Sequence, residues 1–144
     1  MQIKFRMMRL EHRFVEFIPK ELEDNVLYIS TRFRTAIHKC ACGCGIKTVT
    51  PLSPTDWKLT FNGRSVSISP SIGNWSFPCQ SHYWITENVI EWAPKWNKEM
   101  IKIGRDESIK DKERYFYNIN PNHSQVNLKT KSPWWKFSWL FKNL

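Results

Sequence analysis

The sequence predicts a mostly β protein of the α+β class: a small antiparallel β domain with one metal site, followed by a helical segment and an aromatic C-terminal tail. Three observations support this class. Short runs of β-branched and aromatic residues alternate with turn residues over the first two-thirds of the chain. Four cysteines gather in two small groups, which is typical of a metal site. The last third is first charge-rich and then aromatic.

The first predicted strands are short. They run from Arg13 to Ile18, from Val26 to Ser30 and from Phe33 to His38, and the polar segment 21–25 turns the chain between the first two.

Two hairpins are predicted next. Residues 57–61 alternate apolar and polar side chains, and Asn62-Gly63 separates them from a second alternating run at 66–69, which is a strong hairpin signal. The runs 82–86 and 88–92 predict a second hairpin.

The composition changes after Pro94. Residues 95–117 mix both signs of charge with isolated apolar residues, so we expect one or two surface helices with a break at Gly104. Residues 118–132 read as a loop, and the tail from Ser132 to Leu144 is aromatic and basic without an acidic residue.

Chain length sets the domain organisation. The 144 residues suit one core with an appendage. We place a zinc-stapled β domain at 1–93 and a basic helical extension with the tail, packed on it or appended to it, at 94–144. No apolar run approaches roughly 18 residues and no secretory signal is visible at the start, so we expect a cytoplasmic protein without a transmembrane helix.

The cysteines predict the metal site. Cys40, Cys42 and Cys44 fall at alternate positions, and Cys79 begins a Cys-x-x-His motif that ends at His82. Thiols at alternate positions rarely reach disulfide geometry, but they can converge on a soft ion. Zinc takes four such ligands, so the five candidates leave open which four bind it. We expect one zinc ion with a structural role.

Catalytic alternatives have weaker support. No His-Glu-x-x-His motif is present, so a metallo-hydrolase is the third hypothesis. Ser71 or Ser81 with His82 could form a hydrolase pair, but no Gly-x-Ser-x-Gly elbow surrounds either serine. A cysteine thiolate near the metal could act as a thioester carrier. We therefore favour a binding protein over an enzyme.

Five sequence blocks resemble a bacterial family that carries a domain-of-unknown-function label. These blocks are residues 10–19, Cys40–Gly45, residues 50–57, Pro70–Trp75 and Cys79–Ile85, and they span about residues 10–92. Members of the family are often encoded beside multi-ubiquitin-like, E1-like and E2-like proteins. The resemblance implies a zinc-binding adaptor of a bacterial ubiquitin-like conjugation or antiphage defence system, with one of these proteins as its partner.

The net charge of +9 and the pI near 9.6 leave a second hypothesis, a zinc-dependent nucleic-acid-binding module. Two groups of residues are the candidate contacts. The tail offers Trp134, Trp135 and Trp139, which suit a protein partner, nucleic acid or a peripheral membrane surface. A loop near the metal offers Asn74 and Trp75.

Overall fold

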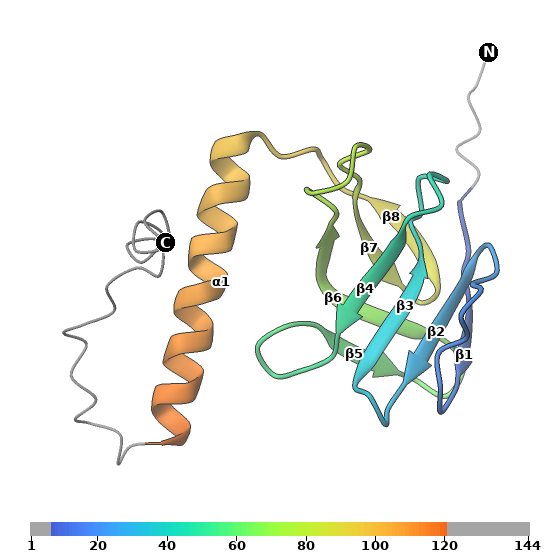
Figure 1. Cartoon of the computed structure of the whole chain (residues 1–144), viewed down its shortest axis with the longest axis horizontal. Coiled ribbons are helices and arrows are strands. Elements are labelled where there is room, and N and C mark those ends of the chain that lie inside the picture. Colours follow the sequence, from blue (N-terminus) through green and yellow to red (C-terminus); the bar gives the residue numbers. More distant parts are fainter. Residues whose placement is uncertain (1–6, 121–144) are drawn as a thin grey trace, which may run out of the picture.

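The computed structural model describes residues 7–120. Within them eight strands precede one helix, as Figure 1 shows. The elements are β1 (Glu11–Phe14), β2 (Val26–Ser30), β3 (Thr35–Lys39), β4 (Lys47–Pro51), β5 (Lys58–Phe61), β6 (Val66–Gly73), β7 (His82–Thr86), β8 (Val89–Trp92) and α1 (Lys98–Ile119).

The strands form two sheets of four strands, in the orders β1-β2-β3-β4 and β5-β6-β7-β8. All neighbouring strands are antiparallel except β1 and β2, which are parallel. The two sheets share one core, because a single buried cluster includes residues of both. From the first sheet and its loops come Leu10, Leu27, Ile29, Ala36, Cys40 and Ala41, and from the second come Val66, Ile68, Ile72, Tyr83, Ile85 and Ile90.

The β7–β8 hairpin shows how the local sequence directs the chain. Glu87 and Asn88 have φ values of 48° and 69°, and a two-residue turn of this left-handed kind matches the twist of paired strands. The Asn88 side chain also accepts a 2.7 Å hydrogen bond from the Val66 amide, which ties the turn to β6.

The predicted fold class is confirmed, and both hairpins lie where the sequence places them. Two details differ. The first strand begins earlier, at Glu11, and ends at Phe14. Strand β4 was not predicted, because its buried residues are Thr48 and Thr50 and therefore give no apolar signal.

Helix α1 continues through Gly104 without a break. The Asn97 side chain begins it by accepting a hydrogen bond from the Met100 amide at 2.8 Å. None of its residues is buried, and it lies beside β6 and the loop between β4 and β5 rather than over the first sheet (Figure 1). A 2.6 Å ion pair between Lys112 and Asp56 connects it to the domain.

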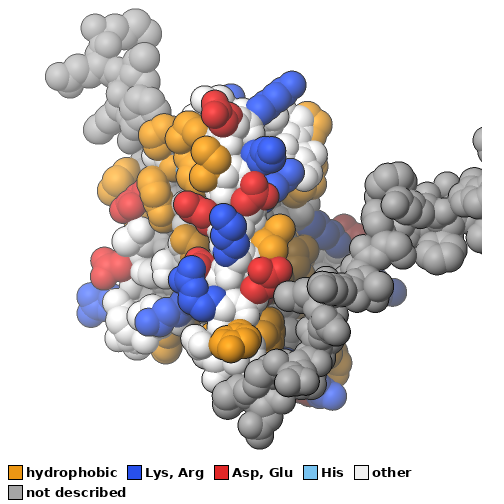
Figure 2. All heavy atoms as spheres, turned by 90° about the vertical axis from the view of Figure 1, so that its left-hand side faces the viewer, with side chains coloured by type: hydrophobic (Ala, Val, Ile, Leu, Met, Phe, Trp, Pro, Cys, Tyr) orange, Lys and Arg blue, Asp and Glu red, His pale blue; other side chains and the backbone are white. Residues whose placement is uncertain are grey.

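The outer face of the helix is mixed in charge. Figure 2 shows Lys and Arg side chains interspersed with Asp and Glu on this face, so the face carries no continuous basic stripe.

Among the described residues, no helix has both the length and the apolar character needed to cross a bilayer. The division of the chain at residues 93 and 94 stays a prediction.

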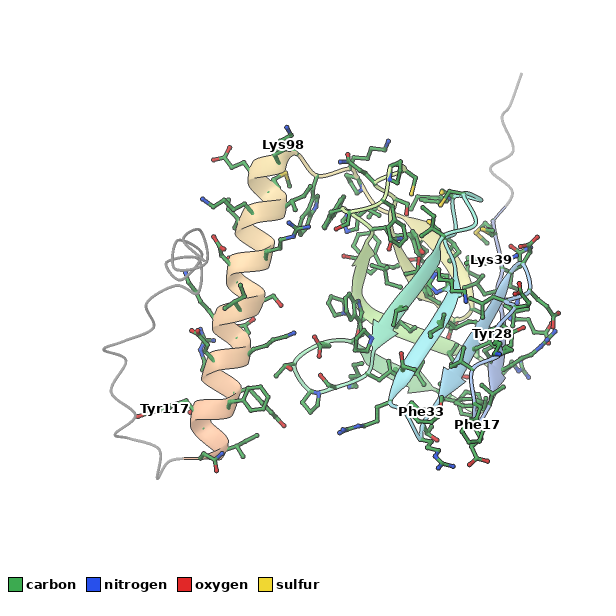
Figure 3. The ribbon with its side chains drawn as sticks, viewed as in Figure 1. Phe17, Tyr28, Phe33, Lys39, Lys98 and Tyr117 are labelled. Carbon is green, nitrogen blue, oxygen red and sulfur yellow. The ribbon has the colours of Figure 1, made fainter. Side chains whose placement is uncertain are left out.

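An exposed aromatic pair marks one end of the first sheet. Phe17 and Phe33 have ring centroids 5.7 Å apart, and Figure 3 shows them at the end of the sheet remote from Lys39. Since Lys39 directly precedes the cysteine loop, this apolar pair lies at the opposite end of the sheet from that loop.

Candidate functional site

The four cysteine sulfurs form one group at the end of the sandwich. The Sγ atoms of Cys40, Cys42, Cys44 and Cys79 all lie within 4.8 Å of one another. Cys40 Sγ is 3.4 Å from Cys42 Sγ and 3.8 Å from Cys79 Sγ, and Cys44 Sγ is 3.9 Å from Cys79 Sγ. Four thiolates at the zinc–sulfur distance of about 2.3 Å would stand about 3.8 Å apart in a tetrahedron. The group therefore fits one zinc-sized ion.

Two glycines shape the loop that presents three of these thiols. The loop joins β3 to β4, and a hydrogen bond from the Cys40 amide to the Ile46 carbonyl closes it at 2.8 Å. Gly43 and Gly45 have φ values of 89° and 80°, which L side chains rarely adopt. This backbone lets alternate side chains point toward a common centre.

Buried polar groups support the innermost thiol. Cys40 is 2% exposed, and its Sγ lies 3.0 Å from Ser81 Oγ and 3.7 Å from Asn74 Nδ2. Asn74 also donates to Ser81 Oγ at 2.9 Å and to Tyr83 Oη at 3.4 Å. Asn74 is only 7% exposed, so it lies inside the protein and not on a contact surface as the sequence suggested.

The thiols differ in acidity. Burial raises the pKa of Cys79, but hydrogen bonds with Ser81 and with neighbouring thiols outweigh it and bring the pKa to about 7. Burial and hydrogen bonds within the group raise the pKa of Cys42 to about 12. Of these two thiols, Cys79 therefore loses its proton more readily. A bound cation would favour deprotonation of the remaining thiols.

His82 lies outside this group. Its Nε2 is 2.8 Å from Ser71 Oγ, and its Nδ1 is 2.7 Å from the Pro94 carbonyl oxygen. Both ring nitrogens therefore have partners other than the cysteines. The structure brings four of the five predicted ligands together and puts the fifth in a different pair.

The partners of the His82 ring determine its tautomer. The Pro94 carbonyl can only accept, so Nδ1 carries the hydrogen. In a neutral imidazole Nε2 then has the free lone pair, and the Ser71 hydroxyl donates to it. A hydroxyl that donates to an imidazole whose other nitrogen is anchored has the geometry of an activated nucleophile with its general base.

Sheet pairing creates this contact. Gly73 of β6 lies opposite His82 of β7, and Ser71 is two residues before Gly73, so the serine and the histidine share one face of the sheet. The opposite face carries Ile72 and Tyr83, which are 3% and 0% exposed, and is part of the core.

Aromatic rings enclose the histidine. The Trp75 ring lies 4.8 Å from the His82 ring and the Trp96 ring 5.1 Å from it, and the two indoles stack at an angle of 17°. Gly73 makes room for this arrangement, because a Cβ there would be 2.4 Å from the Trp75 ring. His82 is therefore 4% exposed, while Ser71 is half-buried.

Helix α1 completes the surroundings of the pair. A cavity of about 260 Å³ is lined on one side by Ser71 and His82 and on the other by Gly104, Arg105 and Ser108 of the helix. The serine is therefore open to a cavity whose far wall is supplied by α1.

The remaining residues predicted to contact a partner fall into two groups. Trp75 is half-buried between His82 and Trp96. Trp134, Trp135 and Trp139 lie outside the described residues. The contributions of Pro94 and Trp96 were missed, because nothing in the local sequence indicates that the chain after β8 returns to the β6–β7 face.

Fold and sites together define a small β-sandwich with a four-cysteine group and a separate serine–histidine pair. Residues 14–93 match the family model described as bacterial ubiquitination-like system serine protease (BubE), and the chain belongs to this family. Comparisons with curated proteins and with solved structures found no significant match. The match links the chain to bacterial ubiquitin-like systems, as the resemblance implied, and its description names a protease where a binding protein was expected.

Proposed function

We propose that this protein is a serine hydrolase of a bacterial ubiquitin-like system, with Ser71 as nucleophile and His82 as general base. The observation that carries the proposal is the 2.8 Å contact between Ser71 Oγ and His82 Nε2, with Nδ1 anchored on the Pro94 carbonyl. The description of the family supports it.

The reaction follows from the geometry of the pair. His82 Nε2 takes the Ser71 proton as Oγ attacks the carbonyl carbon of an acyl bond, and the imidazolium then protonates the leaving group. Water, deprotonated by the same nitrogen, hydrolyses the acyl-serine and restores both residues. A backbone carbonyl stands where many such sites have a carboxylate, so the imidazolium is oriented by a dipole and not by a full charge.

An acyl-transfer site also needs donors for the oxyanion that develops during attack. Arg105 lines the same cavity from α1, and its guanidinium is our candidate for this role. The substrate class is an amide or ester bond made by the tail of a ubiquitin-like protein, which we take from the description of the family.

The cysteine group has a structural role in this proposal. Its four sulfurs can fill a tetrahedral zinc sphere, which leaves no position for a catalytic water. A zinc ion there would connect the β3–β4 loop to the loop that leads into β7, where His82 begins the strand. Zinc as the metal, a role in antiphage defence and a cytoplasmic location remain predictions.

A non-catalytic adaptor is the second candidate. The observation in its favour is the 4% exposure of His82, since a covered imidazole can serve simply as a structural hydrogen-bond partner. In that case the metal would hold loops that contact a ubiquitin-like, E1-like or E2-like partner.

Hydrolysis of a fusion between a ubiquitin-like protein and a short C-terminal extension separates the two candidates. The wild-type protein and Ser108→Ala should cleave it, since Ser108 lines the same cavity without being paired to a histidine. Ser71→Ala should lose cleavage. If Ser71→Ala cleaves as fast as the wild type, the serine hydrolase proposal is wrong.

A further inference from the structure

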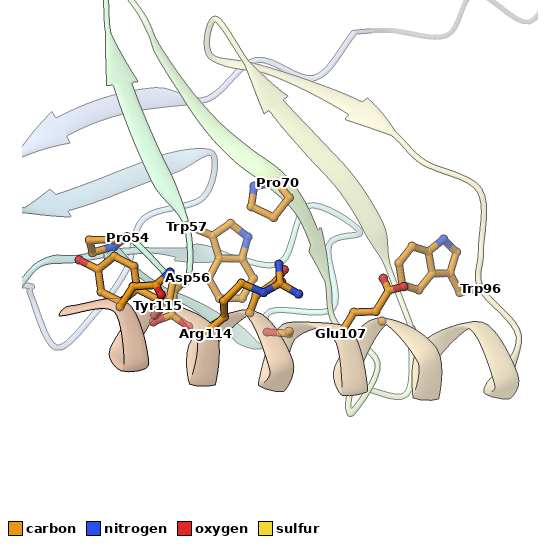
Figure 4. Close-up of a pocket in the computed structure, with 13 residues that line it drawn as sticks. Pro54, Asp56, Trp57, Pro70, Trp96, Glu107, Arg114 and Tyr115 are labelled. Atoms are coloured by element: carbon orange, nitrogen blue, oxygen red, sulfur yellow. The ribbon is translucent and has the colours of Figure 1, made fainter. Parts of the chain in front are cut away.

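A channel leads away from Ser71 between α1 and the second sheet. The 260 Å³ cavity at the serine and a larger one of about 670 Å³ share five lining residues, so the two cavities adjoin each other along α1. The shared residues are Trp57, Pro70, Trp96, Gly104 and Ser108. Figure 4 shows the larger part, with Tyr115 at one end, Trp96 at the other and Trp57 and Pro70 on the sheet side.

The size of the channel suits an extended chain. Along α1 its lining runs from Gly104 to Asn118, which is about 21 Å at the helical rise of 1.5 Å per residue. At about 3.3 Å per residue, an extended peptide of about six residues covers that length.

The sheet side of the channel offers a strand edge with no neighbouring strand among the described residues. Strand β5 pairs with β6 only from Val66 to Ser69, so within the described residues the stretch from Pro70 to Gly73 has a neighbouring strand on the β7 side alone. Strand hydrogen bonds alternate in direction. The Asn74 amide bonds to Ser81 across β7, so the backbone groups of Gly73 and Ser71 point to the open side. The Ser71 carbonyl on this side already accepts a 3.3 Å hydrogen bond from Trp57 Nε1, so the Ser71 amide and the backbone groups of Gly73 are what this edge offers to a peptide.

The walls nearest Ser71 leave little room for a substrate side chain. Three indoles, of Trp57, Trp75 and Trp96, line the smaller cavity, and the helix opposite contributes Gly104. A Cβ at Gly104 would already lie 2.7 Å from the Trp96 ring. A peptide reaching the serine there must therefore have small side chains.

We infer that the channel between α1 and the β6 edge binds an extended polypeptide tail of about six residues whose side chains are small next to the scissile bond. This inference rests on the proposed function, because the bond to be cleaved is delivered to Ser71. The tail adds to the sheet as a short extra strand beside Ser71 and Gly73, in the way that peptides pair with open strand edges elsewhere. Helix α1 lies outside the residues of the family match and forms the other wall.

A matched pair of helix variants tests the channel. Asp111 lines the channel seven residues beyond Gly104, about 10 Å along the helix, and Asp106 lies five residues before Asp111, about 140° around the helix. Both are exposed aspartates. Asp111→Trp should obstruct the channel without reaching Ser71, and Asp106→Trp should not.

The readout compares a long and a short substrate. With a ten-residue fluorogenic peptide that has glycine before the scissile bond, Asp111→Trp should lower kcat/KM at least tenfold. With p-nitrophenyl acetate it should change the rate less than twofold, and Asp106→Trp should change neither rate. Unaltered peptide cleavage by Asp111→Trp overturns the channel, and so does an equal loss on both substrates, since Asp111 would then act on the catalytic pair itself.

The limit on the size of the substrate side chain next to the scissile bond can be tested separately. Replacing the glycine before the scissile bond by phenylalanine should lower kcat/KM at least a hundredfold in the wild-type protein, and cleavage at equal rates contradicts the narrow site. Both results depend on Ser71-dependent hydrolysis. A Ser71→Ala protein that still hydrolyses p-nitrophenyl acetate at the wild-type rate contradicts the proposed function instead, so the two failures can be told apart.

Discussion

The four-cysteine group and the Ser71–His82 pair both adjoin the loop that joins β6 to β7, but they arise in different ways. Three of the thiols are neighbours in the sequence, so a short glycine-containing loop is enough to gather them. Ser71 and His82 meet only because β6 and β7 pair in a particular register. A metal site can therefore be recognised from local spacing, whereas this serine–histidine pair depends on the folded sheet.

The two sites are joined through the segment that returns β6 to β7. Asn74 and Ser81 close this loop with a 2.9 Å backbone hydrogen bond, and Cys79 lies within it. Ser81 contacts Cys40, and the next residue is His82. An ion held by the cysteines would therefore stabilise the start of β7 without touching the reacting atoms.

Loss of a cysteine ligand should have the largest effect on the whole molecule. Cys79→Ser removes one of four thiolates, and the free energy of metal binding contributes directly to folding in small domains. We expect zinc content and the unfolding midpoint to fall together, the latter by about 10 °C or more. Elemental analysis and thermal unfolding measure both, and Ser76→Ala in the same loop is the control. Full zinc content in Cys79→Ser would contradict the ligand assignment.

Replacement of His82 separates the two sites most cleanly. His82→Ala should lower hydrolysis by about a thousandfold, since general bases contribute roughly 10² to 10⁴ in rate. The zinc content should stay at the wild-type value, because His82 contacts Ser71 and Pro94 and not the cysteines. Metal analysis and the peptide assay on one preparation give both answers. Loss of zinc from His82→Ala would return the histidine to the ligand set.

Gly73→Ala should disturb the pair through its aromatic cover. The added Cβ would lie 2.4 Å from the Trp75 ring, so we expect a loss of about 1 to 3 kcal/mol in unfolding free energy and slower hydrolysis. Urea denaturation measures the first. In a Trp75→Ala background the same change should cost much less, because the clash is gone. Equal costs in both backgrounds would mean that Gly73 matters for another reason.

The smallest expected effect is at the tether of α1. The pKa of Asp56 is lowered chiefly by its hydrogen bond with Lys112. The ion pair is therefore present above the ordinary carboxyl pKa and is lost as the pH falls through the lowered value. Asp56→Asn should cost about 0.2 to 1 kcal/mol and speed amide exchange in α1. Asp111→Asn is the control, because it removes only an ion pair within the helix. Unchanged amide exchange of α1 in Asp56→Asn would show that the Asp56–Lys112 ion pair does not hold the helix on the domain.

Much of the fold could be predicted from the sequence, because alternating apolar residues and turn residues lie close together along the chain. The β7–β8 hairpin has both signals. Strand β4 has neither, since its inward residues are threonines. Gly104 suggested a helix break, but a lone glycine is tolerated inside a capped helix of 22 residues.

The site was predictable only in part. The cysteines could be found from spacing, but His82 was assigned to the metal because Cys-x-x-His is a common ligand motif. Ser71 and His82 are eleven residues apart, and the register shift of β6 between Ile68 and Ile72 decides which residues face each other. Pro70 lies within that irregularity and is typical of a bulge, but it does not tell how far the register shifts. Asn74 likewise occurs in a turn-like stretch but is buried by the network around Cys40.

The most direct test of the division between a structural metal group and a catalytic serine is covalent labelling with a small fluorophosphonate, followed by mass spectrometry of the labelled peptide. We predict one label on Ser71 in the zinc-loaded protein, and none in Ser71→Ala or in His82→Ala, both with their zinc retained. Labelling elsewhere, or no labelling of a folded zinc-loaded protein, would contradict the account and favour the adaptor.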